Sequence, residues 1–140
     1  MSKIAVVYWS GTGNTQEMAL AVSDGAKEKG ADVSLFSASD FNDSMVNDFD
    51  AFAFGCPAMG AEVLEEDEFE PMFESCKASL AGKKVALFGS YGWGDGEWMR
   101  TWEDDCAAAG INLACASVIC NEAPDDDAVA ECKALGAALV

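Results

Sequence analysis

Short apolar runs alternate along the chain with amphipathic segments of helical period. The apolar runs cover residues 4–9, 32–36, 50–55 and 84–89, with a fifth inside 111–120. Runs of this length, bounded by glycine and polar residues, are typical of strands that are buried on both faces. The pattern therefore predicts five strands.

The intervening segments carry apolar residues at helical spacing. We predict helices over 14–29, over 69–80, around Trp98 to Cys106 and over 126–139, with Gly30 ending the first. A strand–helix unit repeated five times predicts an α/β protein with a parallel sheet covered on both faces. Right-handed crossovers place the loops after the strands along one edge, where such sheets bind ligands.

Composition narrows the class of protein. The chain has 140 residues, so we expect one domain over residues 1–140. Eight Lys and Arg face twenty-five Asp and Glu, for a formal net charge of −17, and there is no histidine. This charge argues against nucleic acid and membrane partners and favours basic protein partners or high solubility.

No apolar run has the length of a membrane helix or signal peptide, so we expect a cytoplasmic protein.

The six cysteines form no C-x-x-C pair, which gives no support to a zinc or iron–sulfur framework. They are Cys56, Cys76, Cys106, Cys115, Cys120 and Cys132. An even number allows disulfides, but without a secretion signal we favour reduced thiols that fill the core.

The loop after the first strand suits a phosphate group. It consists of Ser10, Gly11, Thr12, Gly13, Asn14 and Thr15 and opens the first helix. Glycines let the backbone wrap round a ligand, side chains supply donors, and the helix start adds free N–H groups. The loop lacks the lysine of a nucleoside-triphosphate loop and the third glycine of the dinucleotide fingerprint. A turn with a helix cap is the alternative.

The loop after the third strand suits a flat ligand. It consists of Cys56, Pro57, Ala58, Met59, Gly60, Ala61 and Glu62. The polarisable side chain of Met59 can lie against a ring, and Gly60 permits a positive φ. Glu62 can accept a hydrogen bond from a ligand N–H. An ordinary glycine turn is the alternative.

The loop after the fourth strand carries an aromatic residue among glycines. It consists of Ser90, Tyr91, Gly92, Trp93, Gly94, Asp95 and Gly96. Trp93, held at the ligand edge, would make a stacking platform, and the alternative is a tryptophan folded back onto the sheet. We expect Trp9, Trp98 and Trp102 in the core or on helix faces.

Together the three loops resemble those of short-chain, clostridial-type flavodoxins. Residues 8–15 resemble the FMN-phosphate motif, and residues 56–62 and 87–94 resemble the two flavin-ring loops. The resemblance covers nearly the whole chain. It implies a flavodoxin-like α/β fold of three layers, α/β/α, with a five-stranded parallel sheet. The implied strand order, 2-1-3-4-5, is that of flavodoxin itself rather than one worked out from these residues.

The resemblance also implies which residues bind non-covalent FMN. They are Ser10, Gly11, Thr12, Gly13, Asn14, Thr15, Pro57, Ala58, Met59, Gly60, Ala61, Glu62, Ser90, Tyr91, Gly92, Trp93, Gly94 and Asn121. The first loop would hold the phosphate, and Met59 and Trp93 would sandwich the isoalloxazine ring. Glu62 would face flavin N3–H, the Gly92 and Trp93 amides would reach the pyrimidine oxygens, and Asn121 would approach the ring.

By the same resemblance the protein is a low-potential one-electron carrier rather than an enzyme. Its FMN would shuttle between neutral semiquinone and anionic hydroquinone. Partners would be basic-surfaced redox proteins, reductases or oxidoreductases that otherwise use ferredoxin, and the carrier would be a monomer. No Lys or Arg occurs between Lys29 and Lys77, so the second loop lies in negative surroundings that disfavour the last reduction. The acidic run 62–74 is either a docking surface or a solvated helix start.

Three other interpretations of the pattern are less well supported. An FMN-dependent quinone or nitro reductase of similar fold would need room for a second substrate over the flavin. A signalling receiver domain would need an aspartate at the end of the third strand, where Cys56 and Pro57 stand. A cysteine-dependent phosphatase would need a C-x₅-R loop after the first strand, which the chain does not have.

Overall fold

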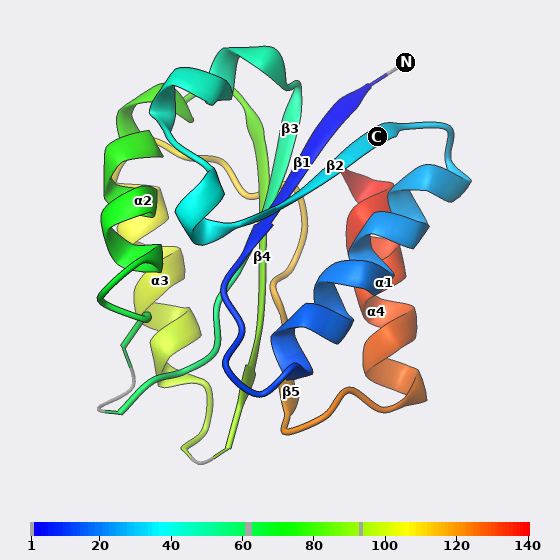
Figure 1. The fold of residues 1–140 in the computed structure, drawn as a ribbon, viewed down its shortest axis with the longest axis vertical. Coiled ribbons are helices and arrows are strands. Elements are labelled where there is room, and N and C mark those ends of the chain that lie inside the picture. Colours follow the sequence, from blue (N-terminus) through cyan, green and yellow to red (C-terminus); the bar gives the residue numbers. More distant parts are fainter. Residues whose placement is uncertain (1, 61–62, 93) are drawn as a thin grey trace.

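A computed structural model of the chain describes residues 2–60, 63–92 and 94–140. Its centre is a parallel sheet in the order β2-β1-β3-β4-β5 (Figure 1). The strands are β1 (Lys3–Tyr8), β2 (Asp32–Ser37), β3 (Ala51–Gly55), β4 (Lys84–Tyr91) and β5 (Val118–Asn121). The fold class and strand order implied by the resemblance are confirmed.

Helices cover both faces of the sheet, which makes three layers (Figure 1). The helices are α1 (Asn14–Glu28), α2 (Phe69–Cys76), α3 (Glu97–Ala108) and α4 (Asp126–Ala138). Successive side chains of a strand point to opposite faces. Phe52 and Phe54 of β3 accordingly belong to the core under α2 and α3, while Ala51 and Ala53 belong to the core under α1 and α4.

The two cores differ in the size of their side chains. Under α2 and α3, aromatic rings pack against one another, and Phe54 and Phe73 meet edge to face with their centroids 5.2 Å apart. Under α1 and α4 the residues are smaller and the helices approach closely. A Cβ added at Gly25 would strike the Lys133 carbonyl, and one added at Gly136 would strike the Val22 carbonyl. Only glycine at these two positions permits that approach.

The second strand–helix unit differs from the prediction. Between β2 and β3 the chain forms two 3₁₀ helices, Ala38–Asp40 and Asp43–Asp48, instead of an α-helix. Asn42 explains part of this, because its side chain accepts the Ser44 N–H and fixes a local turn. The predicted helix over 69–80 is likewise shorter, since α2 ends at Cys76 and a 3₁₀ turn follows.

The last two strands also have different limits from those predicted. In the segment 111–120, Leu113 makes one isolated bridge to Val85 and pairing resumes only at Val118. Between them the Ser117 hydroxyl donates to the Glu103 carboxylate at 2.7 Å, which holds this segment toward α3. The strand β4 extends to Tyr91, so the third loop begins at Gly92.

All six cysteines lie among the described residues and none forms a disulfide, as predicted. Five are buried and Cys115 is half-buried. Within the described residues, no helix combines the length and the apolar character needed to cross a membrane.

Candidate functional site

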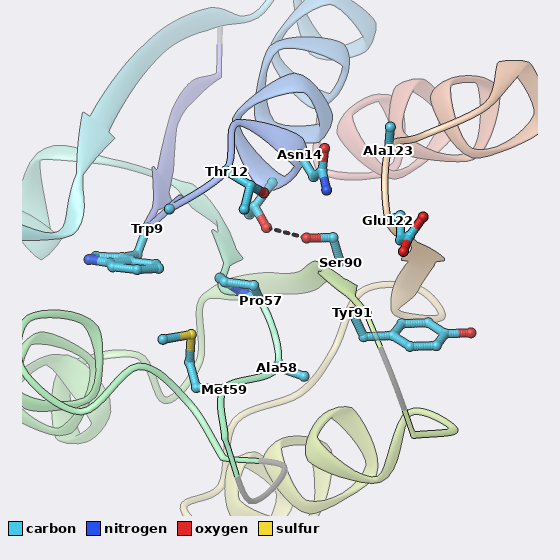
Figure 2. Close-up of a pocket in the computed structure, with 13 residues that line it drawn as sticks. Trp9, Thr12, Asn14, Pro57, Ala58, Met59, Ser90, Tyr91, Glu122 and Ala123 are labelled. Atoms are coloured by element: carbon cyan, nitrogen blue, oxygen red, sulfur yellow. Dashed lines mark hydrogen bonds between the residues drawn. The ribbon is translucent and has the colours of Figure 1, made fainter.

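A cavity of about 590 Å³ opens at the carboxyl edge of the sheet, where the segments after β1, β3, β4 and β5 meet (Figure 2). Its lining residues are Trp9, Gly11, Thr12, Asn14, Thr15, Pro57, Ala58, Met59, Ser90, Tyr91, Gly92, Glu122 and Ala123. The volume lies in the range of small-molecule and cofactor sites. The position is the one expected for ligands of a parallel sheet.

The first loop serves both as a cap and as a wall of the cavity. The Ser10 hydroxyl accepts the N–H groups of Gly13 at 3.1 Å and of Gln16 at 3.3 Å, so Ser10 caps the start of α1. The side of the loop that lines the cavity includes Asn14 and Thr15, in a first turn whose N–H groups lack intrahelical acceptors. The cap interpretation is therefore confirmed for Ser10, and phosphate binding by the residues that line the cavity stays a prediction.

A buried hydrogen bond joins the first loop to β4. The hydroxyls of Thr15 and Ser90 lie 2.8 Å apart, and the two residues are only 1% and 4% exposed (Figure 2). Either hydroxyl can donate, and a second proton remains free to point into the cavity. The bond fixes the first turn of α1 against the sheet beneath the cavity.

The second loop forms the opposite wall. Ala58 N–H donates to the Ser90 carbonyl at 3.0 Å, and Met59 and Val63 exchange two backbone hydrogen bonds of 2.9 and 3.1 Å. Gly60 has φ +34°, which confirms the positive φ predicted there. Ala61 and Glu62 lie outside the described residues.

Aromatic residues stand on two sides of the cavity. Trp9 packs against the core, as predicted, and also lines the cavity, which the sequence analysis did not foresee. Figure 2 shows it across the cavity from Tyr91. The Tyr91 ring lies 5.5 Å from that of the buried Trp98. Trp93, the predicted stacking platform, lies outside the described residues.

The turn after β5 contributes residues that the sequence analysis missed. Asn121 is the last residue of β5 and pairs with Tyr91, and the two residues after it, Glu122 and Ala123, line the cavity. Glu122 has φ +59°, uncommon for a residue with a side chain, and its N–H donates to the Tyr91 carbonyl at 2.7 Å. Their place at the carboxyl edge was the signal that could have identified them.

Most of the predicted site residues therefore surround one cavity. Those that are described but do not line it are Ser10, Gly13, Gly60, Gly94 and Asn121. The described lining residues include the carboxylate of Glu122 but no lysine or arginine. Arg100, on the first turn of α3, is paired with Asp95 at 3.0 Å. An anion in this cavity would be held by hydroxyl, amide and backbone donors.

Comparison with known proteins connects this geometry to a family. The family model described as Flavodoxin matches residues 6–136. The chain is similar to a flavodoxin of Clostridium beijerinckii, with 49% identity over 122 residues, 86% of this chain and 88% of that one. It is 45% identical to a flavodoxin of Megasphaera elsdenii over 96% of both chains. The solution structure of the two-electron-reduced Megasphaera protein superposes with a TM-score of 0.90, covering 97% of each chain.

Proposed function

The chain belongs to the flavodoxin family, whose members bind FMN and transfer electrons rather than act as enzymes, and we propose that it is a low-potential one-electron carrier. Its FMN would be held non-covalently in the cavity at the carboxyl edge. In this proposal the flavin cycles between its one-electron-reduced and two-electron-reduced forms, and residues 1–140 act as one domain.

The chemistry of the cavity fits FMN at both ends. Hydroxyl and amide groups gather at the start of α1, where first-turn N–H groups and the helix dipole favour a phosphate. The remainder of the wall includes Trp9, Pro57, Ala58 and Met59, whose apolar surfaces suit a flat ring. The observation that carries the proposal is this combination of uncharged donors, with no lysine or arginine among the described lining residues, and an apolar wall.

The proposed roles follow this division. Thr12, Asn14 and Thr15 bind the phosphate directly, and Ser10 orients the loop by capping α1. Ser90 lies beside the phosphate or ribityl chain through its contact with Thr15. Met59 contacts the ring, and the sequence-based assignments of Trp93 and Glu62 to the ring stay predictions.

The surroundings of the cavity oppose the addition of a second negative charge. The formal net charge is −17, and the described lining residues carry a carboxylate but no cation. A reduced flavin anion beside a phosphate would therefore be disfavoured, which lowers the potential of the last reduction. The bound group supplies the redox chemistry, and the chain supplies orientation and an electrostatic penalty.

The same charge favours basic redox proteins as partners, including reductases and oxidoreductases that otherwise use ferredoxin. We propose that the carrier works in the cytoplasm, because its six cysteines are unpaired. We also propose that it is a monomer, because its strong negative charge makes copies repel one another. If the acidic surface steers docking, added salt should slow electron transfer to a basic partner.

FMN titration of the purified apoprotein, followed by spectroelectrochemistry, tests the proposal. We expect stoichiometric binding and two separate one-electron steps, the second at low potential. Failure to take up FMN would overturn the proposal. Rapid oxidation of NADH or NADPH by the protein alone would favour an FMN-dependent reductase instead.

A further inference from the structure

One carboxylate of the acidic run 62–74 is buried. Glu65 is 5% exposed, whereas its neighbours Glu66, Asp67 and Glu68 are exposed. A charged side chain is seldom buried without specific partners, because removal from water is costly. The contacts of Glu65 therefore explain its position.

The Glu65 carboxylate accepts three backbone hydrogen bonds. Oε2 accepts the N–H of Asp67 at 2.9 Å, and Oε1 accepts those of Glu68 and Phe69, each at 2.8 Å. The N–H groups of Glu68 and Phe69 lie at the start of α2, where they lack intrahelical acceptors, and that of Asp67 belongs to the turn just before it. Burial by itself raises the pKa of Glu65, but the three donors outweigh it and hold the pKa below its usual value. The carboxylate is thus ionised at neutral pH.

The backbone of Glu65 connects the same point to the end of β3. Its N–H donates to Cys56 Sγ at 3.3 Å, nine residues earlier in the chain. Cys56 is fully buried, and burial raises the pKa of its thiol to about 12, so the sulfur stays neutral. The Cys56 carbonyl accepts the Trp98 Nε1–H at 3.2 Å, and its N–H donates to the Phe88 carbonyl at 3.2 Å. Glu65 is therefore attached to a fixed part of the sheet.

Cys56 and Glu65 mark the two ends of an excursion that forms one wall of the cavity. Pro57, Ala58 and Met59 lie within this excursion and line the cavity. The hydrogen bonds between Met59 and Val63 close its middle, and the contact of Glu65 with Cys56 closes its base. Loss of the Glu65 carboxylate would leave the backbone contact with Cys56 in place but would detach the returning half of the excursion from the start of α2.

We propose that Glu65 is a positioning residue for the cofactor. Its ionised carboxylate ties the base of the excursion to the start of α2 and thereby sets the position of Met59 and Gly60 against the flavin ring. This inference rests on the proposed function, because it assigns Glu65 a role at the same FMN site. Glu65 itself is not among the residues that line the cavity.

A pair of charge-matched variants tests the inference. Glu65→Gln and Glu66→Gln each remove one negative charge from adjacent positions, but only the first disturbs the three N–H contacts. We expect Glu65→Gln to raise the Kd for FMN about tenfold or more, equal to about 1.4 kcal/mol. We expect Glu66→Gln to change it by less than about twofold, because water and salt screen an exposed charge.

Redox potentials distinguish positioning from a general loss of stability. With both variants saturated with FMN, the separation between the two one-electron potentials should change more in Glu65→Gln than in Glu66→Gln. A residue that only stabilised α2 would lower the melting temperature and leave that separation equal in the two variants. Equal Kd values and equal separations would overturn the inference.

Further measurements keep the test decisive if Glu65→Gln does not fold. Glu65→Asp retains the charge but is shorter by one methylene, so it should weaken the contacts and raise the Kd for FMN. An unchanged Kd in Glu65→Asp would contradict the inference. If the wild-type protein binds no FMN, the proposed function fails. If the wild type binds FMN and the Glu65 and Glu66 variants behave alike, only the present inference fails.

Discussion

The two loops that form the cavity walls are held in different ways. The first loop, residues 10–15, is shaped mainly by its own helix, since Ser10 caps α1 within six residues. The second loop, between Cys56 and Glu65, is held by partners from β4, α2 and α3. The proposed phosphate end of the cavity is thus shaped mainly by nearby residues, whereas the proposed ring end depends on distant ones.

Of the substitutions considered, Gly89→Ala should displace the second loop the most. A Cβ at this position would strike the Cys56 carbonyl and lie 3.1 Å from the Trp98 ring, so the end of β3 would have to move. We expect a loss of about 3 kcal/mol or more in the free energy of unfolding of the apoprotein. Urea denaturation measures it. Gly92→Ala is the control, because no atom lies within 4 Å of a Cβ added there; a similar loss in both variants would contradict the explanation.

Thr15→Val should weaken the junction of the first loop with β4. The substitution leaves the buried Ser90 hydroxyl without its 2.8 Å partner, which costs about 2 kcal/mol in stability. The double variant Thr15→Val with Ser90→Ala should recover part of this loss, because no buried hydroxyl is then unpaired. A thermal double-mutant cycle on the apoprotein checks both effects. Strict additivity of the two substitutions would show that the hydroxyls are not coupled.

The stability supplied by Glu65 should depend on pH. Because its pKa is held below the usual value of 4.5, the folded state binds this proton more weakly than the unfolded state. The contribution is complete above that value and is lost as the pH falls through the lower folded pKa. At neutral pH the free energy of unfolding of the wild type should exceed that of Glu65→Gln by about 1.5 kcal/mol, because the variant loses charge-assisted hydrogen bonds.

Denaturation of both proteins across the acid range measures this difference. The two stability curves should converge in acid, where the wild-type carboxylate is protonated. Cys56, whose sulfur accepts the Glu65 N–H, stays neutral throughout this range because its pKa is about 12, and the other carboxylates of the acidic run are the same in both proteins. A difference that is constant with pH would show that ionisation of Glu65 is not responsible.

Gly60→Ala should have a smaller effect on stability and a selective effect on the flavin. Gly60 has φ +34°, and an alanine there costs about 1 kcal/mol although no atom would obstruct its Cβ. We expect that the peptide after Gly60 would turn over so that its carbonyl accepts a hydrogen bond from the one-electron-reduced flavin, and a turn that is harder to rearrange should therefore reduce the yield of that form. Spectroelectrochemistry measures this yield, and equal yields in wild type and variant would refute the role of Gly60.

The sequence predicted the parallel sheet because the hydrophobic period and the length of each apolar run are local properties of the chain, and their alternation indicates strands joined by helices. It predicted the cap formed by the first loop for the same reason, since the loop and the helix that it caps are contiguous in the chain. It did not distinguish Glu65 from Glu66, which have the same side chain in the same acidic run. Their difference arises from the contacts of Glu65 alone, whose carboxylate accepts the N–H groups of residues 67–69 and whose backbone meets Cys56 at the end of β3.

Similar reasons explain the other differences between prediction and structure. Glu122 follows β5 and reaches the cavity only because β5 pairs with β4 beside Tyr91. Trp9 has the large apolar side chain of a core residue. That it also lines the cavity depends on the other loops that enclose the cavity. Residues 38–49 form 3₁₀ turns where an α-helix was expected, because local side-chain hydrogen bonds compete with the helix.

The close approach of α1 and α4 has a consequence for biosynthesis. Gly25 and Gly136 bring together the first and last helices in chain order, so the two surfaces that pack are made far apart in time. Until the ribosome has released α4, the side of α1 that packs against α4 has no partner and stays open to solvent and chaperones. Completion of this layer therefore has to wait for the synthesis of α4, and truncation within α4 should leave a nascent chain prone to aggregation.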